Sequence, residues 1–264
     1  MAENNSDKQS FWEHLDELRT AIVKSLLAAV VFGVAAFCFK DTLFAVILAP
    51  KNDDFVTYRV LNRISGLVIT EGNIDFHVQL ISTGLAEQFM IHMKAALCAG
   101  VLCASPYILY LLFRFVSPAL YVNERRYVVR MVGGGYALFA LGVAVSYFLI
   151  FPLTFRFLGN YQVSGEVENM VALESYISTL ITMSLAMGVV FEIPILSWLF
   201  AKLGFLTADF MRRYRRHAIV LILIVAAVIT PTSDVFTLSL VAMPMWLLYE
   251  ASILIVKNTC NRRA

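Results

Sequence analysis

The amino-acid sequence predicts an all-α polytopic membrane protein with six transmembrane helices, several of them kinked by proline, a concave face and both termini in the cytoplasm. Composition is the first reason. Of 264 residues, 59% are hydrophobic and 15% are charged, against roughly 45–50% and about 25% in a soluble domain. The number of long apolar segments and the uneven distribution of lysine and arginine are the other two. We expect residues 1–264 to form a single membrane domain.

Six apolar segments approach the length of about 20 residues that a helix needs to cross a bilayer core of ~30 Å. The predicted spans are approximately 21–40, 89–113, 130–152, 174–201, 216–231 and 235–256. The fifth is the weakest, because its strictly apolar part, AIVLILIVAAVI, would extend only about 18 Å at about 1.5 Å per residue. Either the flanking basic residues snorkel toward the headgroups, or the bilayer thins locally around this hairpin.

Six spans place both termini on one side, and the basic residues indicate which side. One set of connecting segments holds 15 lysines and arginines, and the other holds five. The five are Lys40, Lys51, Arg59, Arg63 and Arg156. Because cytoplasmic segments carry the excess of positive charge, the termini and the loop 117–126 are predicted to be cytoplasmic. The polar, mostly acidic start is not typical of a cleavable signal, so we expect the first apolar run to be retained.

The outer loop, 41–88, is long and mixes apolar with polar stretches. Residues 42–50, TLFAVILAP, are expected to form a short helix along the outer interface that ends at Pro50. The alternation in NIDFHVQLIS, residues 73–82, favours an extended or hairpin segment. We therefore expect an ordered outer cap and not a separate domain.

Three prolines, Pro106, Pro194 and Pro244, fall inside the second, fourth and sixth predicted spans. Each removes a backbone hydrogen bond and tends to kink its helix. The kinks either serve packing alone or shape a concave surface, and both interpretations stay open.

The helix that enters the first span, FWEHLDELRTAI, separates apolar from charged residues. Its apolar residues recur every three or four positions and are expected to form one face, made of Phe11, Leu15, Leu18 and Ile22. The other face holds Glu13, Asp16, Glu17 and Thr20. These carboxylates either form a solvated face with an Arg19 ion pair or present negative charge to a ligand.

A further carboxylate, Glu124, stands directly before Arg125 and Arg126 in the cytoplasmic loop. Adjacent residues on a helix do not face each other, so an ion pair with these arginines is not assured. If Glu124 and Glu17 converge, they form an acidic pocket on an otherwise basic face. Such a pocket suits guanidinium groups, whose planar fork binds a carboxylate through two parallel hydrogen bonds.

Glu192 lies near the middle of the fourth span, two residues before Pro194. An ionisable group at this depth costs about 2.5–3.5 kcal/mol on insertion scales. We expect Glu192 to face a cavity, a partner or a protonation site, or else to hydrogen-bond the kinked backbone. Lys94 and Glu250 lie nearer to the ends of their spans, where they can snorkel or pair, Lys94 with Glu87 and Glu250 with Lys257. These last two are less persuasive as functional residues.

Several classes of function find little support in the sequence. The four cysteines, Cys38, Cys98, Cys103 and Cys260, form no CxxC pair, so no redox or metal site is expected. HExxH and GxSxG motifs and paired intramembrane aspartates are missing, so we predict neither an enzyme nor a cofactor. The net charge of +2 is weak support for nucleic-acid binding. A secondary transporter would share the kinked helices and the buried acid, but would usually show internal repeats.

Four motifs, in order along nearly the whole chain, resemble those of the TatC family, the signal-peptide receptors of the twin-arginine translocase. They are HLDELR before the first span, FVSPALYVNERR between the second and third, MGVVFEIPIL in the fourth, and TPTSDVF with AMPMWLLYE at the end. The resemblance implies a subunit of the inner (cytoplasmic) membrane that moves folded proteins with the proton-motive force. It also implies binding of paired-arginine signal peptides, single-span TatA/TatB-type partners, self-association and contact with the lipid bilayer.

The resemblance also implies roles for particular residues. The signal-peptide-binding positions correspond to Glu17, Arg19, Phe115, Pro118, Leu120, Tyr121 and Glu124. Two acids correspond to positions linked to partner subunits, Glu192 inside the membrane and Asp234 in the last outer turn. The chain departs from the usual pattern at Thr20, where a basic residue is common, and at Asn123, where a histidine is frequent.

Overall fold

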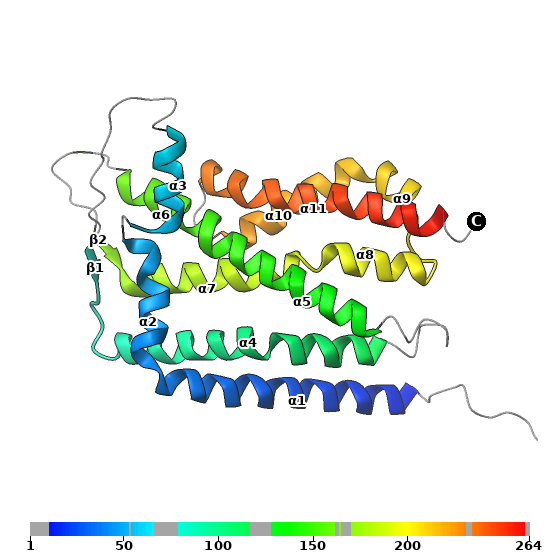
Figure 1. Ribbon diagram of the computed structural model, residues 1–264, viewed down its shortest axis with the longest axis horizontal. Helices are drawn as coiled ribbons and strands as arrows, with labels where there is room; N and C mark the ends of the chain where they lie inside the picture. Colours follow the sequence, from blue (N-terminus) through cyan, green and yellow to red (C-terminus); the bar gives the residue numbers. More distant parts are fainter. Residues whose placement is uncertain are drawn as a thin grey trace, which may run out of the picture.

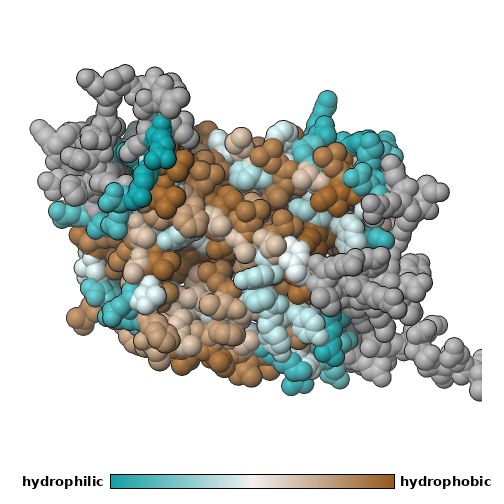
Figure 2. Space-filling view, viewed as in Figure 1, coloured by the Kyte–Doolittle hydropathy of each residue, from teal (hydrophilic) through white to brown (hydrophobic). Residues whose placement is uncertain are grey.

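The structure is a computed structural model that describes residues 11–52, 54–65, 79–116, 128–161, 164, 170–230 and 234–261. Long helices run side by side along its longest axis (Figure 1). They include α1 (Phe11–Cys38), α4 (Glu87–Val116) and α11 (Val235–Asn261), whereas α5 (Val128–Val145) runs obliquely to them. Figure 2 shows that apolar residues cover the middle of the face in view, with polar residues toward both ends. This distribution fits a helix bundle whose middle section lies in the hydrocarbon core of a bilayer.

Five described helical segments are long and apolar enough to cross a membrane. They are Leu15–Cys38, Glu87–Phe115, Met131–Asn160, Leu173–Lys202 and Val235–Thr259. The fifth predicted span forms α10 (Arg215–Ile229), whose 15 residues extend only about 22 Å. The predicted all-helical membrane fold is therefore confirmed, whereas the count of six crossings stays a prediction that depends on α10.

Both ends of the described chain lie at the same end of the bundle. Figure 1 places the start of α1 and the end of α11 at the right, together with α9 (Ala208–Arg213). The opposite end carries the short elements, α2 (Lys40–Leu48) and α3 (Val56–Ser65) among them. This arrangement fits an even number of crossings. Which end faces the cytoplasm stays a prediction from the basic residues.

Two of the long segments contain a break in the α-helical pattern. The segment Met131–Asn160 passes from α5 through a π-helical turn, Ser146–Ile150, into α6 (Phe151–Asn160). The segment Leu173–Lys202 consists of α7 (Leu173–Val190) and α8 (Ile193–Lys202), with a turn at Phe191 and Glu192 between them. Pro194 lies in the first turn of α8, where its missing N–H costs little. Helices α4 and α11 continue through Pro106 and Pro244, so only Pro194 coincides with a break in the helix.

Helices α1 and α4 approach each other closely because glycines lie at their crossing. A Cβ atom added to Gly100 would lie 2.4 Å from the Ala29 carbonyl oxygen and 2.5 Å from the Gly33 nitrogen. Small residues of this kind allow membrane helices to pack backbone against backbone. The main core is formed by buried residues of α7 and its neighbours. It includes Ile150, Phe151, Ile177, Met183, Met187 and Val241.

The cap at the far end is attached to the bundle through tyrosine hydroxyl groups. The Tyr147 hydroxyl donates to the Val46 carbonyl at 2.6 Å, and the Tyr176 hydroxyl donates to the Ile47 carbonyl at 3.1 Å. Both acceptors lie in the last turn of α2, where carbonyl groups lack the N–H of a following helical turn; the Val46 carbonyl also accepts from the Ala49 N–H. Helix α2 ends in a 3-10 turn, Ala49–Lys51, that contains Pro50, as the sequence predicted.

The extended segment of the outer loop pairs with a distant part of the chain. Strand β1 (Gln79–Ile81) is parallel to β2 (Met170–Ala172), so it does not form a hairpin within its own loop. Residues 66–78, which include part of the predicted extended segment, lie outside the described ranges.

Candidate functional site

Glu17 lies near the start of α1 with its carboxylate turned partly into the protein. The side chain is half-buried, whereas Asp16 and Arg19 are exposed. Glu17 Oε2 is shielded from solvent and accepts no hydrogen bond from any residue that the structure describes. The structure shows no ion pair between Glu17 and Arg19, which lie two positions apart and so do not face each other on a helix. The interpretation of Glu17 as part of a solvated face therefore lacks the ion pair with Arg19 that it expected.

The predicted apolar face of α1 is not the face that packs against the bundle. Leu15 is 39% exposed and Ile22 is 58% exposed, whereas Leu18 is half-buried. Apolar side chains of a membrane helix can face lipid as well as protein, so an apolar face need not be the face that packs on the bundle. Helix α1 packs mainly on α4, so most of its apolar surface stays free for lipid.

Most of the second predicted recognition segment lies outside the described residues, including Pro118, Leu120, Tyr121 and Glu124. Its two flanks are described. Phe115 is half-buried in the last turn of α4, and α5 begins at Val128. Both flanks reach the end of the bundle where α1 starts (Figure 1). The segment that carries Glu124 is thus anchored at the same end as Glu17.

Glu192 lies in the turn between α7 and α8 and is 7% exposed. Neither carboxylate oxygen has a hydrogen-bond partner among the described residues. A Cβ atom on Gly135 of α5 would lie 3.1 Å from Glu192 Oε2 and 3.0 Å from the Phe113 ring of α4. The carboxyl group therefore points toward α5 and α4, as expected for a buried acid that faces the bundle or a partner. The glycine run at 133–135 was the sequence signal that could have located these neighbours.

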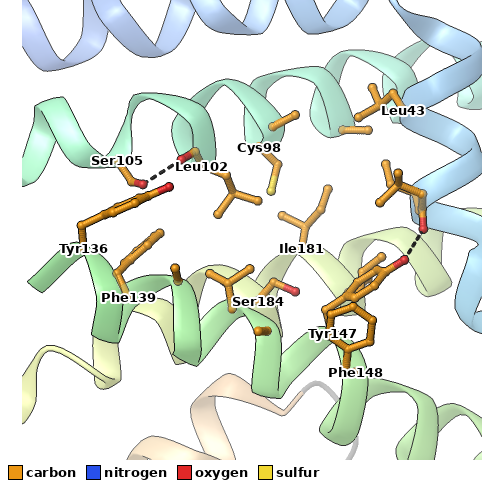
Figure 3. A pocket seen from close by; sticks show the side chains of 18 residues that line it. Leu43, Cys98, Leu102, Ser105, Tyr136, Phe139, Tyr147, Phe148, Ile181 and Ser184 are labelled. Atoms are coloured by element: carbon orange, nitrogen blue, oxygen red, sulfur yellow. Dashed lines mark hydrogen bonds between the residues drawn. The ribbon is translucent and has the colours of Figure 1, made fainter. Parts of the chain in front are cut away.

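A cavity of about 430 Å³ opens between α2, α4, α5 and α7. Figure 3 shows Leu102, Phe139 and Ile181 pointing into it, with the Ser184 hydroxyl at its wall. Its lining is mostly apolar, which suits an acyl chain or an apolar peptide segment. Glu192 is not among the lining residues. This cavity and the buried acid are therefore separate features of the bundle.

Asp234 caps the start of α11. Its Oδ2 accepts a hydrogen bond from the Thr237 backbone N–H at 2.7 Å, the geometry of an N-cap aspartate. Residues 231–233 of the same turn lie outside the described ranges. Asp234 therefore has a structural role as the N-cap of α11, independent of any contact with a partner subunit.

The other two intramembrane charges have partners that the sequence did not identify. Lys94 Nζ lies 2.7 Å from Glu174 Oε1 of α7 rather than against Glu87. Glu87 instead accepts hydrogen bonds at 2.8 Å from the backbone N–H groups of Thr83 and Gly84. Glu250 Oε2 lies 2.8 Å from Arg215 Nη2 of α10, so it does not need Lys257.

Metal-binding groups of three or more histidine, cysteine, aspartate or glutamate side chains are missing from the described ranges. The described cysteines, Cys38, Cys98 and Cys103, are unpaired.

Comparisons with a family model, with related proteins and with a solved structure all indicate the same family. The family model "Sec-independent protein translocase protein (TatC)" matches residues 13–244. A protein of that name from Desulforapulum autotrophicum is 35% identical over 94% of this chain and 84% of its own length. Another from Deinococcus radiodurans is 36% identical over 92% of this chain and 84% of its own length.

A crystal structure of the twin-arginine translocase receptor TatC superposes with a TM-score of 0.77 at 32% identity, over 94% of this chain and all of that chain. The family consists of protein translocase components and is not a family of enzymes. The chain belongs to the TatC family, as a membrane-spanning subunit of the twin-arginine protein translocase.

Proposed function

We propose that this chain binds the paired-arginine signal peptide of folded precursor proteins at the cytoplasmic face and nucleates assembly of the proton-motive-force-driven complex. The observation that carries the proposal is the half-buried carboxylate of Glu17, whose shielded Oε2 has no donor among the described residues. It lies at the end of the bundle where the segment containing Glu124 is anchored (Figure 1).

The chemistry at the end of the bundle that carries Glu17 favours arginine over lysine in the signal peptide. A carboxylate oxygen that lacks a donor is free to accept from a guanidinium group, and a planar fork can engage two acceptors at once. A hydrogen bond to a charged group contributes about 1.5–3 kcal/mol when partly desolvated. Arg19, exposed on the same helix, and half-buried Phe115 at the end of α4 would border the bound peptide.

The apolar part of the signal peptide would follow the concave face of the bundle. The cavity between α2, α4, α5 and α7 offers about 430 Å³ with a mostly apolar lining. An apolar segment that enters such a cavity from lipid exchanges one apolar environment for another, so close packing would hold it there. Occupancy would then alter helix contacts nearby and signal to the rest of the complex.

The partners in this proposal are single-span TatA/TatB-type subunits, with self-association of the chain in the assembled complex. Glu192 and Asp234 are the residues we assign to these contacts. The chain acts as one domain in the inner membrane, surrounded by the lipid bilayer, with its termini in the cytoplasm.

A direct test of the receptor role is the binding of two peptides to the purified full-length protein in detergent. The first carries a paired-arginine motif and the second has both arginines replaced by lysine. We expect the lysine peptide to bind about tenfold more weakly or worse, because a point charge cannot make the two-pronged contact. Equal binding of the two peptides would contradict the receptor role and would favour a transporter of another kind.

A separate prediction concerns Glu192. With a photoreactive residue at exposed Val189, one turn earlier on α7, the Glu192→Ala variant is expected to lose most of its cross-links to single-span subunits. The reason is that a buried acid without a hydrogen-bond partner among the described residues is costly in the membrane, and a partner helix that docks where α4, α5 and α7 meet could supply that partner. Cross-linking is measured in membranes that contain the partner subunits. Thr182→Ala, which removes an exposed polar side chain from the same helix, is the control. An unchanged cross-linking pattern in Glu192→Ala would remove the proposed role.

A further inference from the structure

Helix α3, in the long outer loop, is short and strongly two-sided. Its inner side is fixed to the bundle: Tyr58 is buried, and its hydroxyl donates to the carbonyl groups of Pro50 at 3.1 Å and Pro152 at 3.0 Å. Thr57 also donates to the Phe148 carbonyl, and Phe55 stacks on the Phe148 ring at 5.8 Å. The helix is thus a fixed part of the fold.

The outer side of α3 carries exposed apolar residues. Val56 is 56% exposed and Val60 is 53% exposed, and residues four positions apart lie on the same helix face. Phe148, an exposed apolar residue of the third predicted span, contacts Phe55 and Thr57, the chain neighbours of Val56. The apolar stripe of α3 therefore continues the lipid-facing surface of the bundle and does not stand alone in water.

Basic residues border this stripe. Arg59 and Arg63, also four positions apart, are exposed. Arg156 lies over the Tyr58 ring, with its guanidinium carbon 5.0 Å from the ring centroid, and Lys51 ends the turn that precedes α3. Four of the five basic residues predicted for the outer connecting segments therefore lie on or close to this helix. In Figure 2, polar residues lie beside apolar ones at the upper left, where Figure 1 places α3.

The contacts also fix the depth of α3. Tyr58 lies against the carbonyl of Pro152, in the last third of the helical segment Met131–Asn160, and the charged Arg156 follows one turn later in α6. Figure 1 shows α3 lying across the direction of α4 and α7 rather than along it. A helix that lies close to the charged end of a long apolar segment and across the direction of the bundle has the orientation expected of a helix in the plane of the membrane interface.

We propose that α3 is an interfacial anchor that binds acidic phospholipids, with Val56 and Val60 among the acyl chains and Arg59 and Arg63 at the phosphate groups. Guanidinium groups bind phosphate oxygens through paired hydrogen bonds, and a basic amphipathic helix takes this position at a lipid surface. The anchor would hold the outer end of the bundle at a fixed depth. It is independent of signal-peptide binding, because α3 lies at the other end of the bundle from Glu17 (Figure 1).

The first test locates α3 relative to the bilayer. The full chain, with its four cysteines replaced by serine, receives one spin label at Val60→Cys or at Asn52→Cys and is reconstituted in vesicles of phosphatidylethanolamine and phosphatidylglycerol. We expect the label at position 60 to collide with dissolved oxygen and to be protected from a water-soluble nickel chelate. The label at exposed position 52 should show the reverse. A position-60 label open to the chelate, or protected from both reagents as under a second protein, overturns the proposal.

The second test measures headgroup preference with spin-labelled phosphatidylglycerol. The Arg59→Gln, Arg63→Gln double variant is expected to bind this lipid more weakly, by about fivefold for each arginine removed from an acidic surface. The Arg59→Lys, Arg63→Lys variant keeps both charges and should retain most of the preference. If the glutamine and lysine variants match the parent, the phosphate contacts do not exist and the proposal fails.

Discussion

The Glu17→Gln variant is expected to bind a paired-arginine signal peptide about tenfold more weakly or worse than the parent protein. Glutamine keeps the size of the side chain and one oxygen acceptor, but it loses the charge that makes a hydrogen bond to guanidinium strong. The large effect is expected because Glu17 is half-buried and its Oε2 is shielded from water. A fully exposed carboxylate would contribute far less.

Glu124→Gln is expected to cause a loss of similar size, and the double variant should fail to export a folded reporter that carries a paired-arginine signal. Binding is measured on purified protein, and export is measured in cells after membrane insertion of each variant has been checked. Asp16→Asn is the matched control, because Asp16 is the neighbouring acid on α1 but is exposed. Normal export by both single variants would contradict the assignment of Glu17 and Glu124 as the arginine-binding pair.

The long helices could be predicted from the sequence because the bilayer imposes a simple condition on each of them. A span must be apolar for about 20 residues, so 174–201 and 235–256 agree closely with the observed Leu173–Lys202 and Val235–Thr259. The third span continues as a helix to Asn160, beyond the predicted end at Pro152. A proline in the first turn of α6 interrupts no hydrogen bond of that helix, so it does not end the segment.

The cap could not be predicted in the same way, because its contacts join residues far apart in the sequence. Strand β1 pairs with Met170–Ala172, and no local pattern in either three-residue segment indicates the other. Lys94 illustrates the same limit for charges. Glu87 is nearer in sequence, but its carboxylate accepts hydrogen bonds from two backbone N–H groups at the start of α4. Lys94 therefore pairs with Glu174 on a neighbouring helix.

Some features of the candidate site could be predicted from the sequence, whereas its contacts between distant residues could not. Glu192 stands out in an apolar run, so its burial was expected from the cost of a charge in lipid. Its neighbours Gly135 and Phe113 come from two other helices, and the glycine run at 133–135 was the one feature of the sequence that could have pointed to them. The face of α1 that packs on the bundle could not be identified from the sequence, because lipid and protein interiors select the same residue types.

The Gly100→Leu variant is expected to separate α1 from α4 and to lower the unfolding temperature of the purified protein. Even the first atom of the new side chain would lie 2.4 Å from the Ala29 carbonyl oxygen and 2.7 Å from the Gly33 Cα. Both are backbone atoms, so relief requires α1 to move as a whole and not merely to change a rotamer. Overpacking in a core typically costs about 1–3 kcal/mol and occasionally more, and a backbone clash belongs at the upper end.

Gly133→Leu is the matched control, because a Cβ atom at Gly133 would meet no other atom within 4 Å. Helix separation is measured with a short thiol cross-linker between Phe37→Cys and His92→Cys, whose parent rings stack at 3.9 Å across α1 and α4. We expect efficient cross-linking in the protein that carries only these two cysteine substitutions, and also when Gly133→Leu is added. Adding Gly100→Leu is expected to abolish the cross-link. Since α1 also carries Glu17, Gly100→Leu should weaken signal-peptide binding without altering any residue that contacts the peptide. Intact cross-linking and an unchanged unfolding temperature would show that the α1–α4 crossing tolerates a side chain at Gly100.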